Sequence, residues 1–497
     1  MLLDAPSATG RGGRSSAPPG RGLMLGVLLS AMFIVQFDFF VVNVAAPSLA
    51  RDLHAGAGML ELVVGGYAFA FASGMITGGR LGDIYGHRRL FVIGMAAFGV
   101  ASLLCGVTAT AGQLVAARLL QGAAGALMVP QVLAVITAHF PAASKPRALA
   151  GYGMASGLGS IAGQVLGGAL LEPQLSVPGW RLIFLINVPV CAVAAVLAAR
   201  HLPAPVPGRN AGLDPVGAVG VCLALVLVLL PLTLGRTSGW PVWSWICMAA
   251  AVPVTVGTLL WERALTRRSG SPVLDLTLFR SRSFSSGMVA GIAFQLYFGS
   301  FMFTLTLLLQ SGLGLRPLAA GLVFAPMGIL FGASSLLGRR LIGRYGMRIL
   351  LVGSATTACG LLSLTLLLHG SGPSVEAPWV VPCLCLCLCL VGAGNGLVLP
   401  ALIGAALVQV RPEKAGAASG VLTTTQQFAS SAGVAVVGAT FFVMLGGAPD
   451  AQDYARAMTA SALIDVVLVA AVLCMCWLIM RRTAAGAEAG AEAEAGG

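Results

Sequence analysis

The sequence predicts an all-α integral membrane protein with fourteen transmembrane helices. Of its 497 residues, 57% are hydrophobic and only 9% are charged, whereas soluble domains carry about 25% charged residues. Apolar runs of about 20 residues, the length that one helix needs to cross a bilayer, recur from Leu23 to Met480, and most charged residues lie in the short segments between them. Lipid is therefore the expected solvent for most of the surface.

Taken in order, the apolar runs form two groups of six predicted helices with a pair between them. The first bundle, residues 23–200, has predicted spans at 23–47, 59–79, 90–108, 114–138, 148–171 and 181–199. The inserted pair, residues 213–262, has spans at 215–234 and 243–262. The second bundle, residues 284–480, has spans at 284–311, 318–338, 349–369, 379–402, 416–445 and 457–480. The leader 1–22 and the Ala/Gly/Glu-rich tail 483–497 are predicted to be disordered.

The positive charges predict the orientation. With both termini in the cytoplasm, the inner loops hold most of the 29 lysines and arginines, and the outer loops hold only Arg51, Arg181, Arg236, Arg316 and Arg456. Loops rich in lysine and arginine stay on the cytoplasmic side. We therefore expect a multi-pass protein of the cell membrane, and removing one predicted span would scramble this pattern.

Composition and motifs argue against other classes of protein. The net charge of +12 is spread over loops and forms no basic stripe for nucleic acid. Phosphate-binding loops, zinc-protease motifs and nucleophile elbows are absent from the sequence, so we predict no enzyme and no cofactor. The eleven cysteines lie in apolar segments without the usual spacing of zinc ligands. Apolar filling is the preferred interpretation for them, with metal or redox use as the alternative.

The loop after the second predicted helix carries the most specific motif. Gly86 permits a tight turn, and Asp83 lies near basic residues with which it can form a charge cluster. The segment resembles the G-x-x-x-D-x-x-G-[basic]-[basic] signature of the major facilitator superfamily, through Gly79, Asp83, Gly86, Arg88 and Arg89. The resemblance implies a gating latch between two six-helix halves, and the alternative is a positive loop with an incidental aspartate. A weaker copy, Arg340 to Arg348, follows the tenth predicted helix with Gly343 in place of the aspartate.

The fourth predicted helix carries Arg118, Gln121, Gly122 and Gly125 on one face. An arginine inside a span costs about 2.5–3.5 kcal/mol on insertion scales, so it should face a polar cavity or a partner. The segment resembles the superfamily's R-x-x-Q-G motif, which implies a role for Arg118 in proton coupling. A structural arginine that extends to the outer surface is the alternative.

The fifth predicted helix resembles the antiporter motif G-x-x-x-G-P-x-x-G-G, through Gly159, Gly163, Gly167 and Gly168. Glycines four apart let a neighbouring helix approach closely. Gln164 stands where the family has proline, which puts the expected bend in doubt. A generic packing face is the alternative to an antiporter helix.

The first predicted helix resembles the D-x-x-x-x-N-x-A-x-P stretch of fourteen-helix drug:proton antiporters, through Asp38, Asn43 and Pro47. Asp38 is flanked by Phe37, Phe39 and Phe40, so its carboxyl is expected to be poorly solvated and able to take up and release a proton. Anionic Asp38 would instead attract a lipophilic cation, helped by the aromatic rings. A structural hydrogen bond to another helix is the alternative role.

Several further residues are candidates for a central substrate cavity: Phe37, Phe40, Asn43, Tyr67, Gln121, Gln310, Asn395 and Gln426. For Asn43, as for Gln36 on the same face, a packing contact is the preferred interpretation and substrate contact the alternative. Asp465 is a second acid in a predicted span. Because the last helix of this fold is expected at the periphery, we predict a shallow structural role for Asp465.

Together these features predict a proton-coupled exporter of small organic molecules, with protons, the substrate and the lipid bilayer as partners. The resemblance implies lipophilic or cationic drugs or antibiotics as substrates. Export of an endogenous natural product, import of a nutrient, and a non-transporting membrane scaffold are the alternatives.

Overall fold

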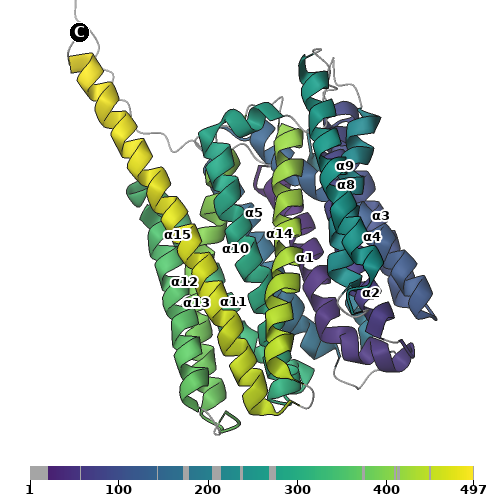
Figure 1. Ribbon diagram of the computed structural model, residues 1–497. Helices are drawn as coiled ribbons and strands as arrows, with labels where there is room; N and C mark the ends of the chain where they lie inside the picture. The colour runs from purple at the N-terminus through teal and green to yellow at the C-terminus, as the bar shows by residue number, and fades with distance from the viewer. Residues whose placement is uncertain are drawn as a thin grey trace, which may run out of the picture.

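The computed structural model is a bundle of long, roughly parallel helices (Figure 1). It describes residues 21–495 except 56, 143, 172–177, 204–213, 236–238, 268–275, 347, 372–374, 408–409, 411–414 and 447–448. All but the last two residues of the predicted leader, 1–22, lie outside this range. The first group of helices is α1 (Arg21–Asp52), α2 (Ala57–Tyr85), α3 (His87–Val107), α4 (Ala111–His139), α5 (Lys145–Leu170), α6 (Gly179–Leu185) and α7 (Asn187–His201).

Two helices separate this group from the second one: α8 (Pro215–Leu234) and α9 (Val242–Arg267). The second group opens with a short 3-10 turn, η1 (Leu276–Arg280), and contains α10 (Arg282–Leu307), the π turn η2 (Leu308–Gly312), α11 (Pro317–Tyr345), α12 (Arg348–Ser371), α13 (Val380–Leu407), α14 (Ala415–Leu445) and α15 (Ala451–Ala495). Each predicted span thus has a helix at its place in the chain, and the division into two six-helix bundles with an inserted pair stays a prediction.

Among the described residues, twelve helices are long and apolar enough to cross a membrane, with α6 and α7 counted as one span. The helices α5 and α8 are not among the twelve. The qualifying apolar stretch of α8, Pro215–Val228, is shorter than the others, and α5 is rich in glycine and other small residues. Length and composition therefore support twelve of the fourteen predicted spans.

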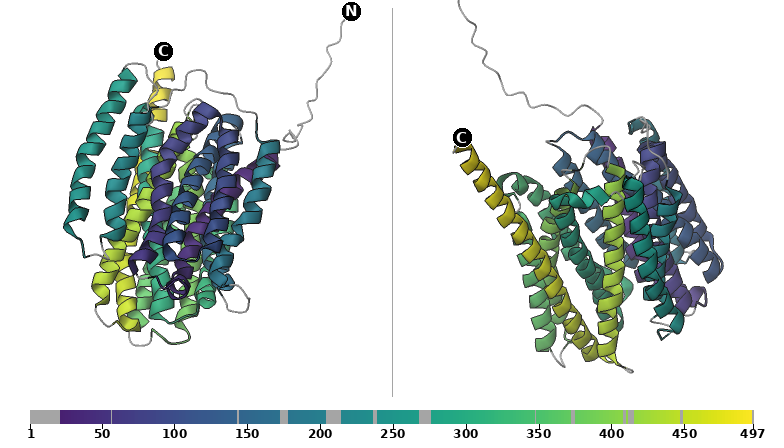
Figure 2. Two further views of the ribbon diagram at one scale, coloured as in Figure 1. Left: turned by 90° about the vertical axis from the view of Figure 1, so that its right-hand side faces the viewer. Right: turned by 45° about the horizontal axis from the view of Figure 1, so that its top comes forward.

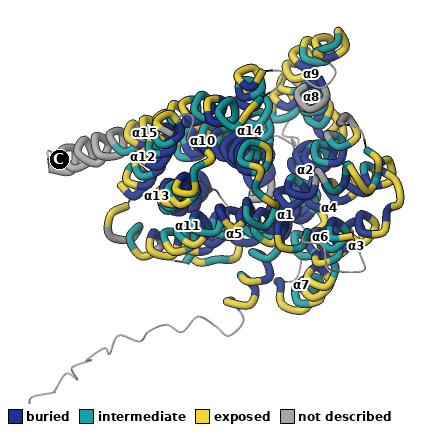
Figure 3. Tube along the Cα trace, turned by 90° about the horizontal axis from the view of Figure 1, so that it is seen from below, coloured by how far each residue is buried: buried dark blue, intermediate teal, exposed yellow. Residues whose placement is uncertain are grey.

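The two groups of helices pack in corresponding ways. In the first half, α2 packs on α4 and α1 on α5, and in the second half α11 packs on α13 and α10 on α14. The halves meet where α5 contacts α11 and α13 and where α2 contacts α14. The inserted helix α8 packs on α9, α2 and α14, so the pair stands at the edge of the bundle (Figures 2 and 3).

Both the interior and much of the outer surface are apolar, unlike those of a water-soluble protein. Large apolar side chains such as Val443, Leu366 and Ile329 are 80%, 71% and 69% exposed, whereas Asp38 and Arg118 are completely buried. Wide apolar exposure of this kind requires an apolar surrounding, and polar side chains at membrane depth face the protein interior. The distribution agrees with a protein embedded in lipid.

Three elements differ from the predicted ones. The helix predicted at 181–199 breaks at Ile186 between α6 and α7, because Pro189 has no backbone N–H to bond the preceding turn. The helix predicted at 284–311 ends in the π turn η2. The prediction of a disordered tail at 483–497 is corrected as far as Ala495, because α15 continues to that residue. Alanine and glutamate, which fill this segment, are strong helix formers.

Candidate functional site

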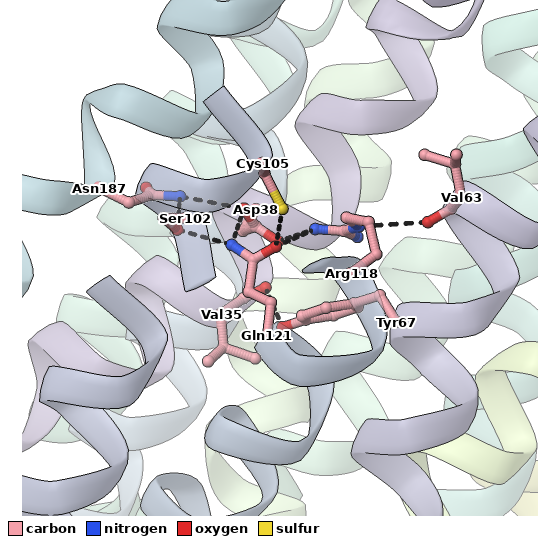
Figure 4. A network of polar contacts seen from close by, with 9 residues as sticks. All are labelled: Val35, Asp38, Val63, Tyr67, Ser102, Cys105, Arg118, Gln121 and Asn187. Atoms are coloured by element: carbon pink, nitrogen blue, oxygen red, sulfur yellow. Dashed lines mark hydrogen bonds and ion pairs between the residues drawn. The ribbon is translucent and has the colours of Figure 1, made fainter. Parts of the chain in front are cut away.

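A buried acid and a buried base face each other inside the first half. Asp38 on α1 and Arg118 on α4 have no exposed surface, and Arg118 Nη1 forms a short ion pair with Asp38 Oδ2 (Figure 4). Breaking such a pair by removing one partner costs about 3–5 kcal/mol, because an unpaired charge stays buried. The two residues therefore depend on each other.

Amide side chains complete the shell of the Asp38 carboxylate. Oδ1 accepts hydrogen bonds from Gln121 Nε2 at 2.8 Å and from Asn187 Nδ2 at 3.0 Å. Ser102 Oγ lies 2.7 Å from the same Gln121 nitrogen and 3.3 Å from the Asn187 nitrogen. Asp38 is poorly solvated, as predicted, because it is completely buried, and the donors around it can stabilise its ionised form.

Arg118 has partners on a second side. Its Nε donates to the Val63 carbonyl at 3.2 Å, and its guanidinium lies 4.1 Å from the ring centroid of Tyr67. The Tyr67 hydroxyl donates to the Val35 carbonyl at 3.3 Å. Arg118 therefore does not extend to the outer surface, and the cluster joins α1, α2, α3, α4 and α7 (Figure 4).

Glycines set the spacing that lets this cluster form. A Cβ on Gly122 would lie 3.0 Å from the backbone nitrogen of Phe71 and against the carbonyl of Tyr67, and a Cβ on Gly125 would lie 3.0 Å from the Phe71 ring. The missing side chains allow α4 to approach α2 closely. Of the predicted face, Arg118, Gly122 and Gly125 therefore meet α2, whereas Gln121 reaches α1 and α3.

The predicted cavity residues do not all converge. Tyr67 and Gln121 join the Asp38 cluster. Phe37 belongs to an apolar cluster with Trp180, and Phe40 meets Phe298 of the second half edge to face at 6.3 Å between ring centroids.

The other predicted cavity residues lie on separate elements. Asn395 is buried in the second half, where Nδ2 donates to the Tyr297 hydroxyl at 2.9 Å. Gln426 is buried on α14, whereas Asn43 on α1 and Gln310 in η2 are half-buried. A single substrate-binding surface made of all the predicted residues is not visible among these contacts.

The predicted charge cluster at the end of α2 forms in part. The Asp83 carboxylate lies 3.7 Å from Arg80 Nη1 and 3.6 Å from His87 Nε2. Arg88 instead donates a short hydrogen bond to the Ala199 carbonyl at the end of α7, and Arg89 is exposed. Gly79 is buried in the last turns of α2. Arg88 thus connects the start of α3 to α7, within the first half.

Gly86 separates α2 from α3 with a backbone φ of 93°. Gly346, at the matching place in the weaker copy of the loop, also has a positive φ, 56°. Side chains rarely tolerate these conformations. The shared geometry supports the internal repeat predicted from the two loops.

Replacing Gly86 by alanine is expected to destabilise the protein by about 1–3 kcal/mol, because a side chain strains this backbone. The matched control is Gly26→Ala in α1, where a Cβ meets nothing within 4 Å and alanine favours the helix. Thermal unfolding of the purified proteins measures both. Equal unfolding temperatures for the two variants would contradict the assignment of strain to Gly86.

The glycines of α5 make a tight seam against α1. A Cβ on Gly159 would lie 2.5 Å from the Phe33 carbonyl, and a Cβ on Gly163 would lie 2.7 Å from the Phe37 carbonyl. Gly167 faces Val41 in the same way. Gln36 Nε2 donates to Ser160 Oγ at 3.4 Å along this seam, which agrees with a packing role for Gln36.

Helix α5 also packs on the second half, against α11 and α13. Gly168 lies against Pro317 at the start of α11, and Gln164 Nε2 donates to Thr306 Oγ1 of α10 at 3.3 Å. The α-helix is continuous from Lys145 to Leu170. Gln164, standing where the resembling motif has proline, therefore adds a hydrogen bond between the halves.

The prediction of a shallow place for Asp465 is wrong: it is fully buried on α15, because α15 packs on α10, α12 and α14. Sequence reasoning also gave no role to Ser102, Tyr297 and Ser300. A serine or tyrosine in an apolar helix is too common to signal a site, and only its buried partners do so.

Comparison with known proteins agrees with this architecture. The sequence profile of the Major Facilitator Superfamily matches residues 28–434. The chain belongs to this superfamily. As a major facilitator protein it is a membrane transporter and not an enzyme.

Curated relatives of this major facilitator transporter are similar over most of its length. The "Probable actinorhodin transporter" of Streptomyces coelicolor is 36% identical over 441 residues, 88% of this chain and 76% of the relative. The "Puromycin resistance protein pur8" of Streptomyces alboniger is 33% identical over 95% of this chain and 94% of its own. The human organic anion transporter MFSD10 (TETRAN) shares the fold with a TM-score of 0.59 and 16% identity, over 91% of this chain and 100% of its own.

Proposed function

We propose that this transporter exports small organic molecules in exchange for protons. The observation that carries the proposal is the buried ion pair of Asp38 and Arg118, surrounded by Gln121, Asn187 and Tyr67. An isolated acid and base inside a membrane protein are costly, and a pair that can change its protonation is a means of coupling. No catalytic motif in the sequence competes with this use.

The proposal includes fourteen spans with both termini in the cytoplasm. Its support is the insertion of α8 and α9 between two groups of helices that pack alike, together with the excess of arginine in the inner loops. An even number of spans places both ends of the chain on one side. Tagging each terminus and testing its access to a membrane-impermeant reagent from either side checks this arrangement.

In the proposed cycle a proton competes with Arg118 for the carboxylate of Asp38. Protonation of Asp38 removes the charge that holds Arg118, so the hydrogen bonds of Gln121 and Asn187 to the carboxylate weaken with it. Because these side chains join five helices of the first half, their release would change how that half packs. Return of the ion pair on proton release would complete the cycle and couple it to the substrate.

The proposed substrates are lipophilic or cationic antibiotics and drugs. Support comes from relatives named for actinorhodin transport, puromycin resistance, tetracenomycin C resistance and export, methylenomycin A resistance and cephamycin export. Because some of those names describe export of a compound, a natural product made by the cell itself is the second candidate substrate.

Purified protein in liposomes with an internal pH dye tests the proposal. Actinorhodin, puromycin, tetracenomycin C, methylenomycin A, a cephamycin and the cationic dye ethidium are added in turn across an imposed pH gradient. Proton movement that depends on one of these compounds and exceeds that of protein-free liposomes is the expected result. Transport of a compound without proton movement would contradict the proton exchange.

A further inference from the structure

The second half of the bundle contains a buried acid of a different kind from Asp38. Asp465 on α15 is fully buried, as Asp38 is. Its Oδ1 lies 2.6 Å from Ser300 Oγ of α10, and its Oδ2 has no hydrogen-bond partner among the described residues. No described lysine or arginine forms an ion pair with it. A bare carboxylate in such a place would carry a large desolvation penalty.

The hydrogen bonds of the Ser300 hydroxyl indicate which protonation state of Asp465 agrees with the structure. Ser300 Oγ also lies 2.8 Å from the carbonyls of Leu296 and Tyr297, and a hydroxyl has only one hydrogen to donate. If Asp465 is ionised, Ser300 must give that hydrogen to the carboxylate, and Oδ2 stays unpaired. If Asp465 is protonated, it donates to Ser300, and Ser300 donates to its own helix.

The charges around Asp465 do not oppose this assignment. The titratable side chain beside it on α10 is Tyr297, whose hydroxyl is hydrogen-bonded to Asn395. Neither α14 nor η2 carries a titratable residue. The remaining titratable groups on α10, α12 and the described part of α15 up to Met480 are Arg282, Arg348, Cys359, His369, Asp453, Tyr454, Arg456, Cys474 and Cys476.

None of those groups supplies a buried positive charge. Arg282, Arg348 and His369 lie at helix ends and are exposed. Arg456 is 70% exposed and pairs with Asp453 at 3.2 Å. Among the described residues, Asp465 therefore has no counter-charge like the one that Arg118 provides for Asp38.

We propose that Asp465 and Ser300 form a second proton-binding site, with the proton on Asp465 in the conformation described here. The site deepens the proposed proton exchange, on which its role in transport rests. Asp38 is held ionised by Arg118 in this conformation while Asp465 holds a proton. The two halves would then carry separate protonation sites, one on the first helix of its bundle and one on the last.

Infrared spectroscopy of the purified protein in lipid tests the site without any substrate. A protonated carboxyl gives a C=O stretching band that a carboxylate lacks and that shifts in D2O. We expect the wild-type band to decrease in Asp465→Asn and to persist in Asp38→Asn, the matched control for a buried acid. A band unchanged by Asp465→Asn, or one that never shifts in D2O, would overturn the proposal.

A second variant keeps the test decisive if Asp465→Asn folds poorly. Ser300→Ala removes the acceptor of the proposed hydrogen bond, so the band should move to higher frequency while its area stays constant. No movement would count against the site. These spectra need no substrate, so the site and the proposed proton exchange can fail separately. Loss of the band in Asp465→Asn would support the site whatever the liposome assay shows. Absence of compound-dependent proton movement in liposomes would count against the exchange alone.

Discussion

Replacing Asp38 by asparagine is expected to abolish substrate-dependent proton flux in liposomes. Asparagine keeps the size of the side chain and can still meet Gln121 and Asn187, but it cannot bind an exchangeable proton or neutralise Arg118. The buried guanidinium then lacks its counter-charge, which should lower the stability of the protein by about 3–5 kcal/mol. Flux with the internal pH dye and thermal unfolding measure the two effects.

The double variant Asp38→Asn/Arg118→Gln separates coupling from folding. Removing both charges leaves a neutral hydrogen-bonded cluster, and such replacements of a buried pair are often neutral for stability. We expect unfolding close to that of the wild type and no proton flux. Flux retained in either variant would show that protons are carried elsewhere and would contradict the role given to Asp38.

Alanine at Gly168 is expected to slow transport strongly. The added Cβ would lie 2.9 Å from Leu318 Cα and against the Pro317 carbonyl, at a contact between the two halves. Overpacking of this kind costs about 1–3 kcal/mol. It destabilises only the conformation in which Gly168 packs against the start of α11. A shift of that size changes the populations of two conformations by about 5- to 150-fold.

Gly291→Ala is the matched control, because a Cβ at this position of α10 has nothing within 4 Å. We expect its transport rate to equal that of the wild type, while Gly168→Ala loses rate but still folds as a stable protein. Rates measured in the same liposome assay compare them. Equal rates in the two variants would mean that the approach of α5 to α11 does not limit transport.

Much of the fold could be predicted because the bilayer imposes a local rule on the chain. The predicted spans from 23–47 to 457–480 correspond to helices of the structure, and the turn at Gly86 was predicted from its glycine. The errors arose where local composition gave a weak signal. Pro189 interrupted one predicted helix after α6, and the Ala/Glu-rich segment after Arg482 continued α15.

The candidate site was predictable residue by residue but not as an assembly. Arg118 and Asp38 stood out because charges in apolar spans are rare. The aromatic neighbours of Asp38 in the sequence predicted poor solvation, which agrees with its burial, but they could not indicate its polar partners, because side chains next to each other on a helix point in different directions. Its actual neighbours are Arg118, Gln121 and Asn187, which come from two other helices.

The sequence by itself determined the class of protein, the order of the helices and the residues with unusual charge, because each depends on hydrophobicity and turn chemistry within a short stretch. Only the tertiary structure decided that Arg118 neutralises Asp38, that Gln164 bonds across the halves, and that Asp465 is buried beside Ser300 with no cation from the described residues. Those facts depend on contacts between residues as far apart as Ser300 and Asp465, and helix packing sets them.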